Sequence, residues 1–181
     1  MAAASPTESP RPITRETLEA VLGDNAPMRI SAKADYAVRA ALELASLQEP
    51  EPRPVKGDHV ATAQSIPIKF LENILLDLRQ AGLVGSRRGP EGGYWLARPA
   101  AEISVADVIR AVDGPLASVR GEKPEDLTYQ GSAEALSSVW VALRSSLREV
   151  LENVTLADAA AGKLPKHVTA RLDAPEAWKR R

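Results

Sequence analysis

The first strongly patterned part of the chain has apolar residues at helical spacing. Ser31 can cap a helix that runs to about Leu47, because small and aliphatic residues recur along one face of this stretch. The prolines within residues 48–54 break the pattern and predict a loop. The residues of the apolar face are Ala34, Ala37, Val38, Ala41, Leu42 and Ala45.

Two more helices are predicted after the loop. Residues 55–63 are long enough for a short helix, and Ser65-Ile66-Pro67 is an entry signal for another, since proline is tolerated in a first turn. This third helix runs to about Ala81, and Gly82 stands where a C-terminal cap is expected. Its buried side is predicted to hold Phe70, Leu71, Ile74, Leu75 and Leu78.

Two short extended runs follow at 83–88 and 94–97. The glycine-rich segment 89–93 between them predicts a β-hairpin. Ser104 and Asp107 then have the spacing of a capping box, and the helix that they begin is stopped by Gly114-Pro115.

The last predicted element is a long helix over about 133–161. At 1.5 Å per residue it would span roughly 40 Å, which is longer than a small domain needs for its own core. We therefore expect this helix to form a homodimer through its apolar stripe. The stripe consists of Leu136, Trp140, Leu143, Leu147, Val150, Leu151 and Val154.

These elements predict a mainly α fold: a winged helix-turn-helix with a small β-hairpin wing and a long C-terminal dimerisation helix. The expected segments are a disordered N-terminal arm at 1–27, the DNA-binding domain at 28–99, a connecting helix and sensor loop at 100–132, the dimerisation helix at 133–162 and a flexible tail at 163–181.

Composition narrows the possible chemistry. Hydrophobic residues make up 44% of the chain and charged residues 26%, as in soluble globular proteins, while 4% aromatics require a core of Ala, Val, Leu and Ile. The absence of cysteine excludes disulfides and thiolate-held metals, so we expect no metal and no cofactor. No apolar run is long enough for a signal peptide or a membrane span, which predicts a cytoplasmic protein with no membrane partner.

Charge is distributed unevenly. The net charge is −1, but residues 28–99 hold ten basic and eight acidic residues, a local excess of two. An excess this small is also typical of an ordinary solvated surface, so it supports DNA binding only weakly.

The third helix and the hairpin supply the candidate contacts to double-stranded DNA. In the helix, Lys69 can reach a phosphate, Glu72 can accept a hydrogen bond from cytosine and Asn73 can pair with adenine. In the hairpin, arginine can enter a narrow minor groove and glycine lets the backbone approach closely. A solvated hairpin end and plain turn formation are the alternatives there. The hairpin candidates are Arg87, Arg88, Gly89, Gly92 and Gly93.

Several motifs together resemble the Rrf-type family of bacterial winged-helix regulators, over roughly three quarters of the chain. The resemblance implies that Glu72, Asn73 and Arg88 contact DNA and that the long helix dimerises. The motifs are Ala34-Asp35-Tyr36-Ala37, Ile66-Pro67 with Phe70-Leu71-Glu72, Ala81-Gly82-Leu83-Val84, Arg88-Gly89-Pro90-Glu91-Gly92-Gly93-Tyr94, Ala111-Val112-Asp113-Gly114-Pro115-Leu116 and Thr155-Leu156-Ala157-Asp158.

The chain departs from the cluster-binding members of that family. Those members carry three cysteines in the loop that here reads 118–126 without any. Asp35 falls where some relatives supply a carboxylate ligand, and without sulfur partners we expect it to cap a helix or form an ion pair. The resemblance therefore implies a non-cluster regulator whose signal is a small-molecule effector or a protein partner.

An enzymatic function has little support in the sequence. The only histidines, His59 and His167, fall in a short helix and in the tail, so neither indicates an enzyme. A protein-interaction adaptor that binds a metabolic enzyme through the long helix and the loop is the alternative to a transcriptional repressor. The adaptor would not respond to DNA.

Overall fold

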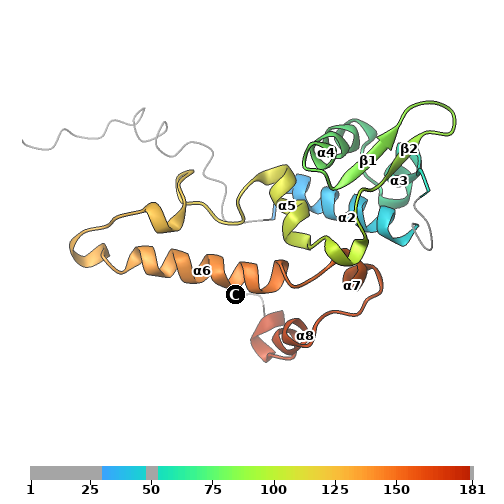
Figure 1. Ribbon diagram of the computed structural model, residues 1–181. Coiled ribbons are helices and arrows are strands. Elements are labelled where there is room, and N and C mark those ends of the chain that lie inside the picture. The colour runs from blue at the N-terminus through green and yellow to red at the C-terminus, as the bar shows by residue number, and fades with distance from the viewer. Residues whose placement is uncertain (1–29, 48–52, 180–181) are drawn as a thin grey trace, which may run out of the picture.

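The computed structural model describes residues 30–47 and 53–179, which are mainly helical and include one two-stranded antiparallel hairpin (Figure 1). The predicted arm at 1–27 lies outside the described residues. The helices and strands are α2 (Ala32–Ser46), α3 (Gly57–Gln64), α4 (Ile68–Gln80), β1 (Val84–Arg87), β2 (Gly93–Leu96), α5 (Val105–Asp113), α6 (Leu136–Leu151), α7 (Leu156–Ala160) and α8 (Lys166–Leu172).

Helix α2 lies at the centre of the core and contacts α3, α4, α5 and α7. Its inner face carries Ala34, Ala37 and Ala40, each fully buried, so neighbouring backbones can approach it closely. The predicted cap is confirmed, because the Ser31 hydroxyl accepts a hydrogen bond from the Ala34 amide at 2.9 Å. The scarcity of aromatic residues thus matches a core of closely packed small and aliphatic side chains.

Helices α3 and α4 form the helix-turn-helix. Ser65 adopts a left-handed conformation at φ 52° and ψ 44°, and the next residue, Ile66, is buried in the turn. On α4, the predicted burial is confirmed for Leu71, Ile74, Leu75 and Leu78 but is wrong for Phe70, which is 60% exposed. Those four aliphatic side chains already fill the arc of the helix that faces the core, and Phe70 lies at its edge beside α2.

The wing is a hairpin of β1 and β2 in which Val84 pairs with Leu96 and Arg87 with Gly93. Val55, just before α3, adds an isolated bridge to Tyr94, with reciprocal backbone hydrogen bonds of 2.8 Å. The base of the wing is therefore attached to the helix-turn-helix by backbone pairing.

Helix α5 begins and ends as predicted. The Ser104 hydroxyl accepts from the Asp107 amide at 3.1 Å, and the Asp107 carboxylate accepts from the Ser104 amide at 3.0 Å, which completes the capping box. Gly114 caps the other end at φ 82°, a backbone conformation that favours glycine.

The prediction of one long helix over 133–161 is wrong, because α6 ends at Leu151. A second capping box, in which Thr155 and Asp158 exchange hydrogen bonds, starts the separate helix α7. Leu156 is fully buried, and its amide donates to the Ile103 carbonyl at 2.8 Å, so α7 belongs to the core around α2. Val154, assigned above to a dimer interface, is 7% exposed and packs within its own chain.

The segment 163–181, expected to be a flexible tail, contains helix α8 and a 3-10 turn at Pro175–Trp178. Val168 on α8 is buried. The Arg171 guanidinium pairs with Glu149 of α6 at 2.6 Å, so α8 is connected to α6. The sequence pattern was too short and too polar on one side to predict this helix.

Candidate nucleic-acid interface

The outer face of α4 carries the three predicted helix contacts. Lys69, Glu72 and Asn73 are all exposed, because the core takes up the opposite face of the helix. Leu76, one turn after Asn73, is 41% exposed on the same outer face. An outer face that combines a cation, a carboxylate, an amide and an aliphatic group can interact with both phosphates and base edges.

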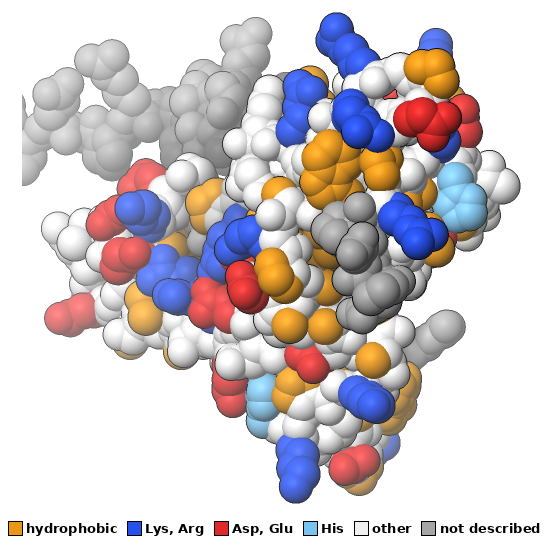
Figure 2. Space-filling model, turned by 45° about the vertical axis from the view of Figure 1, so that its right-hand side comes forward, with side chains coloured by type: hydrophobic (Ala, Val, Ile, Leu, Met, Phe, Trp, Pro, Cys, Tyr) orange, Lys and Arg blue, Asp and Glu red, His pale blue; other side chains and the backbone are white. Residues whose placement is uncertain are grey.

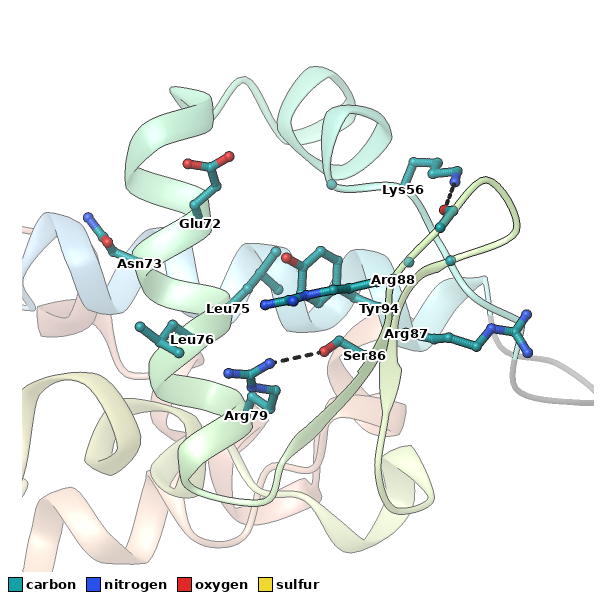
Figure 3. A pocket seen from close by; sticks show the side chains of 14 residues that line it. Lys56, Glu72, Asn73, Leu75, Leu76, Arg79, Ser86, Arg87, Arg88 and Tyr94 are labelled. Atoms are coloured by element: carbon teal, nitrogen blue, oxygen red, sulfur yellow. Dashed lines mark hydrogen bonds between the residues drawn. The ribbon is translucent and has the colours of Figure 1, made fainter.

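The two wing arginines point in different directions (Figure 3). Arg88 extends from the end of β1 towards α4. Arg87 points to the opposite side of the wing, where its guanidinium donates to the Glu91 carbonyl at 2.9 Å. Arg88 is therefore the wing arginine that faces the same space as Glu72 and Asn73.

That space is a groove of about 550 Å³ between α4 and the wing. It brings together all the predicted DNA-contact residues except Lys69, which lies on α4 outside the lining. The predicted residues that line it are Glu72, Asn73, Arg87, Arg88, Gly89, Gly92 and Gly93.

Glycine at two wing positions is required by close backbone packing. Gly92 is buried, and a Cβ on it would lie 2.7 Å from the Arg88 carbonyl carbon and nearer still to the Arg87 carbonyl oxygen. A Cβ on Gly93 would lie 2.5 Å from the Val55 carbonyl oxygen. These glycines therefore set the shape of the wing.

Two basic residues in the groove were not predicted. Lys56 donates to the Gly89 carbonyl at 3.3 Å and to the Pro90 carbonyl, so it attaches the wing tip to the start of α3. Arg79 lies two turns after Glu72 on α4, and its guanidinium donates to the Ser86 hydroxyl at 3.4 Å. The heptad spacing from Glu72 could have indicated Arg79, whereas the position of Lys56 depends on the tertiary fold.

The groove is positively charged although the whole chain is not. Its lining includes three cations, Lys56, Arg79 and Arg88, and one carboxylate, Glu72. Arg87 also belongs to the lining, but its guanidinium points to the other side of the wing. Figure 2 shows Lys and Arg side chains projecting from the upper edge of the molecule, where α4 and the wing lie. A concentration of positive charge around a groove attracts the phosphate backbone of nucleic acid.

Helix α6 presents a second notable surface. No residue of α6 is buried, and Val139 is 53% exposed. The predicted stripe residues differ in their surroundings. Leu147 and Leu151 border a hollow with Ile109 of α5, and the Trp140 indole donates to the Tyr129 hydroxyl at 3.2 Å. The half-buried remainder consists of Leu136, Leu143 and Val150.

The residues present do not fit an iron–sulfur cluster held by cysteine, because the chain has none. Within 30–47 and 53–179, no group of three or more His, Asp or Glu residues is placed to hold a metal. Asp35 instead forms an ion pair with Arg39 at 3.2 Å on the surface of α2, one of the two roles expected for it.

Comparison with known proteins shows the family. Residues 30–162 match the Rrf2 family, described as Iron-dependent Transcriptional regulator, and the chain belongs to this family. It is therefore a transcriptional regulator of the helix-turn-helix type and not an enzyme. The part of the chain that the structure describes contains no helix with the length and hydropathy needed to cross a membrane.

Individual relatives agree with this assignment. The chain is 56% identical over 146 residues to the HTH-type transcriptional regulator Rv1287 of Mycobacterium tuberculosis, covering 81% of this chain and 89% of that protein. It is 36% identical over 148 residues to the regulator IscR of Pectobacterium carotovorum, covering 81% of this chain and 88% of that protein.

Two solved structures have the same winged-helix fold. The global cysteine regulator CymR of B. subtilis superposes with a TM-score of 0.62 at 32% identity, over 74% of this chain and 97% of that one. IscR of T. potens superposes with a TM-score of 0.58 at 33% identity, over 84% of this chain and 93% of that one.

Proposed function

We propose that this protein is a homodimeric, sequence-specific DNA-binding repressor that acts in the cytoplasm without an iron–sulfur cluster. The observation that carries the proposal is the groove between α4 and the wing, where groups suited to base edges and to phosphates face the same space. Glu72 and Asn73 are suited to base edges in the major groove, and Arg88 to the backbone or the adjoining minor groove. Lys69 would bind a phosphate from the start of α4, and Arg87 would do so from the outer side of the wing.

The dimer would form through α6. Apolar side chains left half-exposed along one helix are typical of a surface that is buried by a second copy. Leu136, Leu143 and Val150 would lie at the centre of the interface, with Trp140, Leu147 and Leu151 beside them and Val154 outside it. Leu143→Glu should therefore yield monomers, since a buried unpaired charge costs several kcal/mol.

Ser145→Glu provides the matched control for dimerisation, because it places the same charge on the opposite, exposed side of α6. Light scattering should report a monomer for the Leu143 variant and a dimer for the Ser145 variant. A dimer of unchanged affinity in both would count against α6 as the interface.

The DNA-reading function is tested by selection from random duplexes. A two-fold dimer with two α4 helices should select a pseudo-palindrome whose half-sites are about one helical turn, or a small multiple of it, apart. Asn73→Ala should relax base preference at one position per half-site at a cost of about 1–3 kcal/mol. Arg88→Ala should weaken binding and flatten its salt dependence.

The alternative function is an adaptor that binds a metabolic enzyme through α6 and the loop before it. Selection of no palindrome, together with unchanged DNA binding in both variants, would favour the adaptor. The cluster-free state predicts a colourless protein after anaerobic purification, and binding to DNA without reconstitution. A small-molecule effector or protein partner would then supply the signal.

A further inference from the structure

A second charged hollow lies between α5, the segment that follows it and α6. It has a volume of about 280 Å³. Its lining includes four cations, Arg110 of α5, Lys123 of the segment, and Arg144 and Arg148 of α6, against one carboxylate, Glu125. Basic and acidic side chains crowd together over the left half of Figure 2, the part of the molecule that holds α6.

The segment that carries Lys123 is held in place by its own local structure. Val119 and Glu122 exchange backbone hydrogen bonds of 3.0 and 3.1 Å across a tight turn. Pro124, which starts the 3-10 turn Pro124–Asp126, is fully buried, and this turn packs against α6. Lys123 and Glu125 flank the buried proline, so their backbone positions beside the hollow are fixed.

One carboxylate outside the hollow, that of Glu152, orients two of its arginines. Glu152, which is not part of the lining, accepts from Arg110 of α5 and from the Arg148 Nε at 2.9 Å. The Arg110 hydrogen bond, with that of Arg148, holds the pKa of Glu152 below its ordinary value, so the carboxylate is charged at neutral pH. This arrangement fixes two guanidinium groups at the wall of the hollow.

The third arginine pairs with the one carboxylate of the lining. Arg144, whose side chain is 21% exposed, pairs with Glu125. A backbone hydrogen bond, together with the Arg144 guanidinium, lowers the pKa of Glu125. Lys123 forms no ion pair with any residue of the described part of the chain.

The carboxylates do not satisfy all of this positive charge. Asp107 lies 3.8 Å from Arg110, so the four cations are opposed by three carboxylates, those of Asp107, Glu125 and Glu152. Each guanidinium also has five N–H donors, and one carboxylate can accept only two of them in a bidentate pair. We propose that the hollow is a binding site for a small multivalent oxyanion, held by Lys123, Arg144, Arg148 and Arg110.

The dimensions and walls of the hollow select among anions. A volume of about 280 Å³ is at the lower end of small-molecule sites, so a phosphate compound or a di- or tricarboxylate fits better than a nucleotide. Pro115, Leu116 and Ala117 form the apolar part of the wall and leave room for a short carbon skeleton. Both classes of ligand are compact anions with at least two negative charges, and such an anion can bridge α5 and α6.

Isothermal titration of the full chain with pyrophosphate and with citrate, at constant ionic strength, tests the site without any DNA. The result is therefore independent of the proposed transcriptional function: either proposal can be refuted while the other is supported. We expect saturable binding of at least one of the two anions and none of acetate, which carries a single charge.

Removing a cation or a carboxylate from the lining distinguishes a specific site from general electrostatic attraction of anions to the protein. Lys123→Gln should weaken binding roughly 10- to 100-fold, since one charge-assisted hydrogen bond is lost from a side chain that forms no ion pair within residues 30–47 and 53–179. Glu125→Gln should tighten binding, because it removes the carboxylate that competes for Arg144. Lys163→Gln, an equal charge change at an exposed position outside the hollow, should leave the affinity unchanged.

The proposal fails if neither anion saturates the wild-type protein, or if Lys123→Gln binds as Lys163→Gln does. Circular dichroism and thermal unfolding of each variant identify any loss of folding. If Lys123→Gln were unfolded, Arg148→Gln would replace it as the charge-removal variant, with the same expected loss of affinity.

Discussion

Gly92→Ala tests whether the shape of the wing, apart from its charge, contributes to DNA binding. The new Cβ would meet backbone atoms of Arg87 and Arg88 and no flexible side chain that could move aside. The 2.7 Å separation from the Arg88 carbonyl carbon must grow to the 3.4 Å of ordinary contact, a shift of at least about 0.7 Å, and the Arg87 carbonyl oxygen, which is nearer, requires a larger one. The 3.0 Å hydrogen bond from the Gly92 amide to the Gly89 carbonyl closes the same turn and would be strained or lost.

The expected loss of DNA affinity depends on whether the free protein or the DNA complex bears the strain. Overpacking of this kind costs about 1–3 kcal/mol, and the exposed tip of the free wing can relax and avoid most of it. If DNA binds only the original conformation of the wing tip, the variant must return to that strained conformation in order to bind. The affinity should therefore fall roughly 5- to 150-fold per wing that contacts the DNA, while the melting temperature changes little.

Fluorescence anisotropy with the selected operator, at two salt concentrations, measures this effect. Gly92→Ala removes no charge, so its salt dependence should equal that of the wild type, whereas Arg88→Ala should flatten it. Gly57→Ala is the matched control, because it lines the same groove and its Cβ would have Tyr94 at 3.6 Å, an ordinary contact. An operator affinity for Gly92→Ala equal to that of Gly57→Ala would refute the conclusion that wing shape matters.

Three further predictions concern α7 and its contact with the core. Thr155→Ala removes the cap of α7 and should cost about 1 kcal/mol in urea unfolding, while unchanged stability would show that the capping box contributes nothing. Leu156→Ala, at a fully buried position, should cost about 2–5 kcal/mol in the same assay, and a cost below about 1 kcal/mol would contradict the docking of α7 on the core. The Thr155 side-chain and backbone hydrogen bonds lower the pKa of Asp158 in the folded state, so its contribution should be complete near neutral pH and lost between about pH 5 and pH 2; a Thr155→Ala variant with the same acid unfolding curve as the wild type would contradict this.

Local signals predicted most of the DNA-binding fold. The caps at Ser31, Ser104 and Gly114 are local interactions, and the structure confirms all three. The aliphatic side of α4 was also predicted, because four of its residues recur at helical spacing. Phe70 was misplaced because apolar character alone does not distinguish the centre of a buried arc from its edge.

The groove was predicted only in part, for a different reason. Glu72 and Arg88 belong to recognisable motifs on single elements, and Asn73 follows Glu72 on the same helix, so sequence alone could mark all three as candidates. Lys56 reaches the groove only because the pairing of Val55 with Tyr94 attaches the start of α3 to the wing. A contact between residues 33 positions apart leaves no periodic signal in either segment.

The break between α6 and α7 changes how the proposed dimer would relate to DNA. One continuous helix would project from the DNA-binding domain and could tilt freely at its single attachment. Instead, α6 ends at Leu151 and is followed by the separate helix α7, whose Leu156 packs into the core with α2. At the same end of α6, Glu152 pairs with Arg110 of α5, and the turn Pro124–Asp126 also packs against α6. An α6 attached in this way should hold the two α4 helices of a dimer at a defined separation, which is what a fixed spacing of half-sites requires.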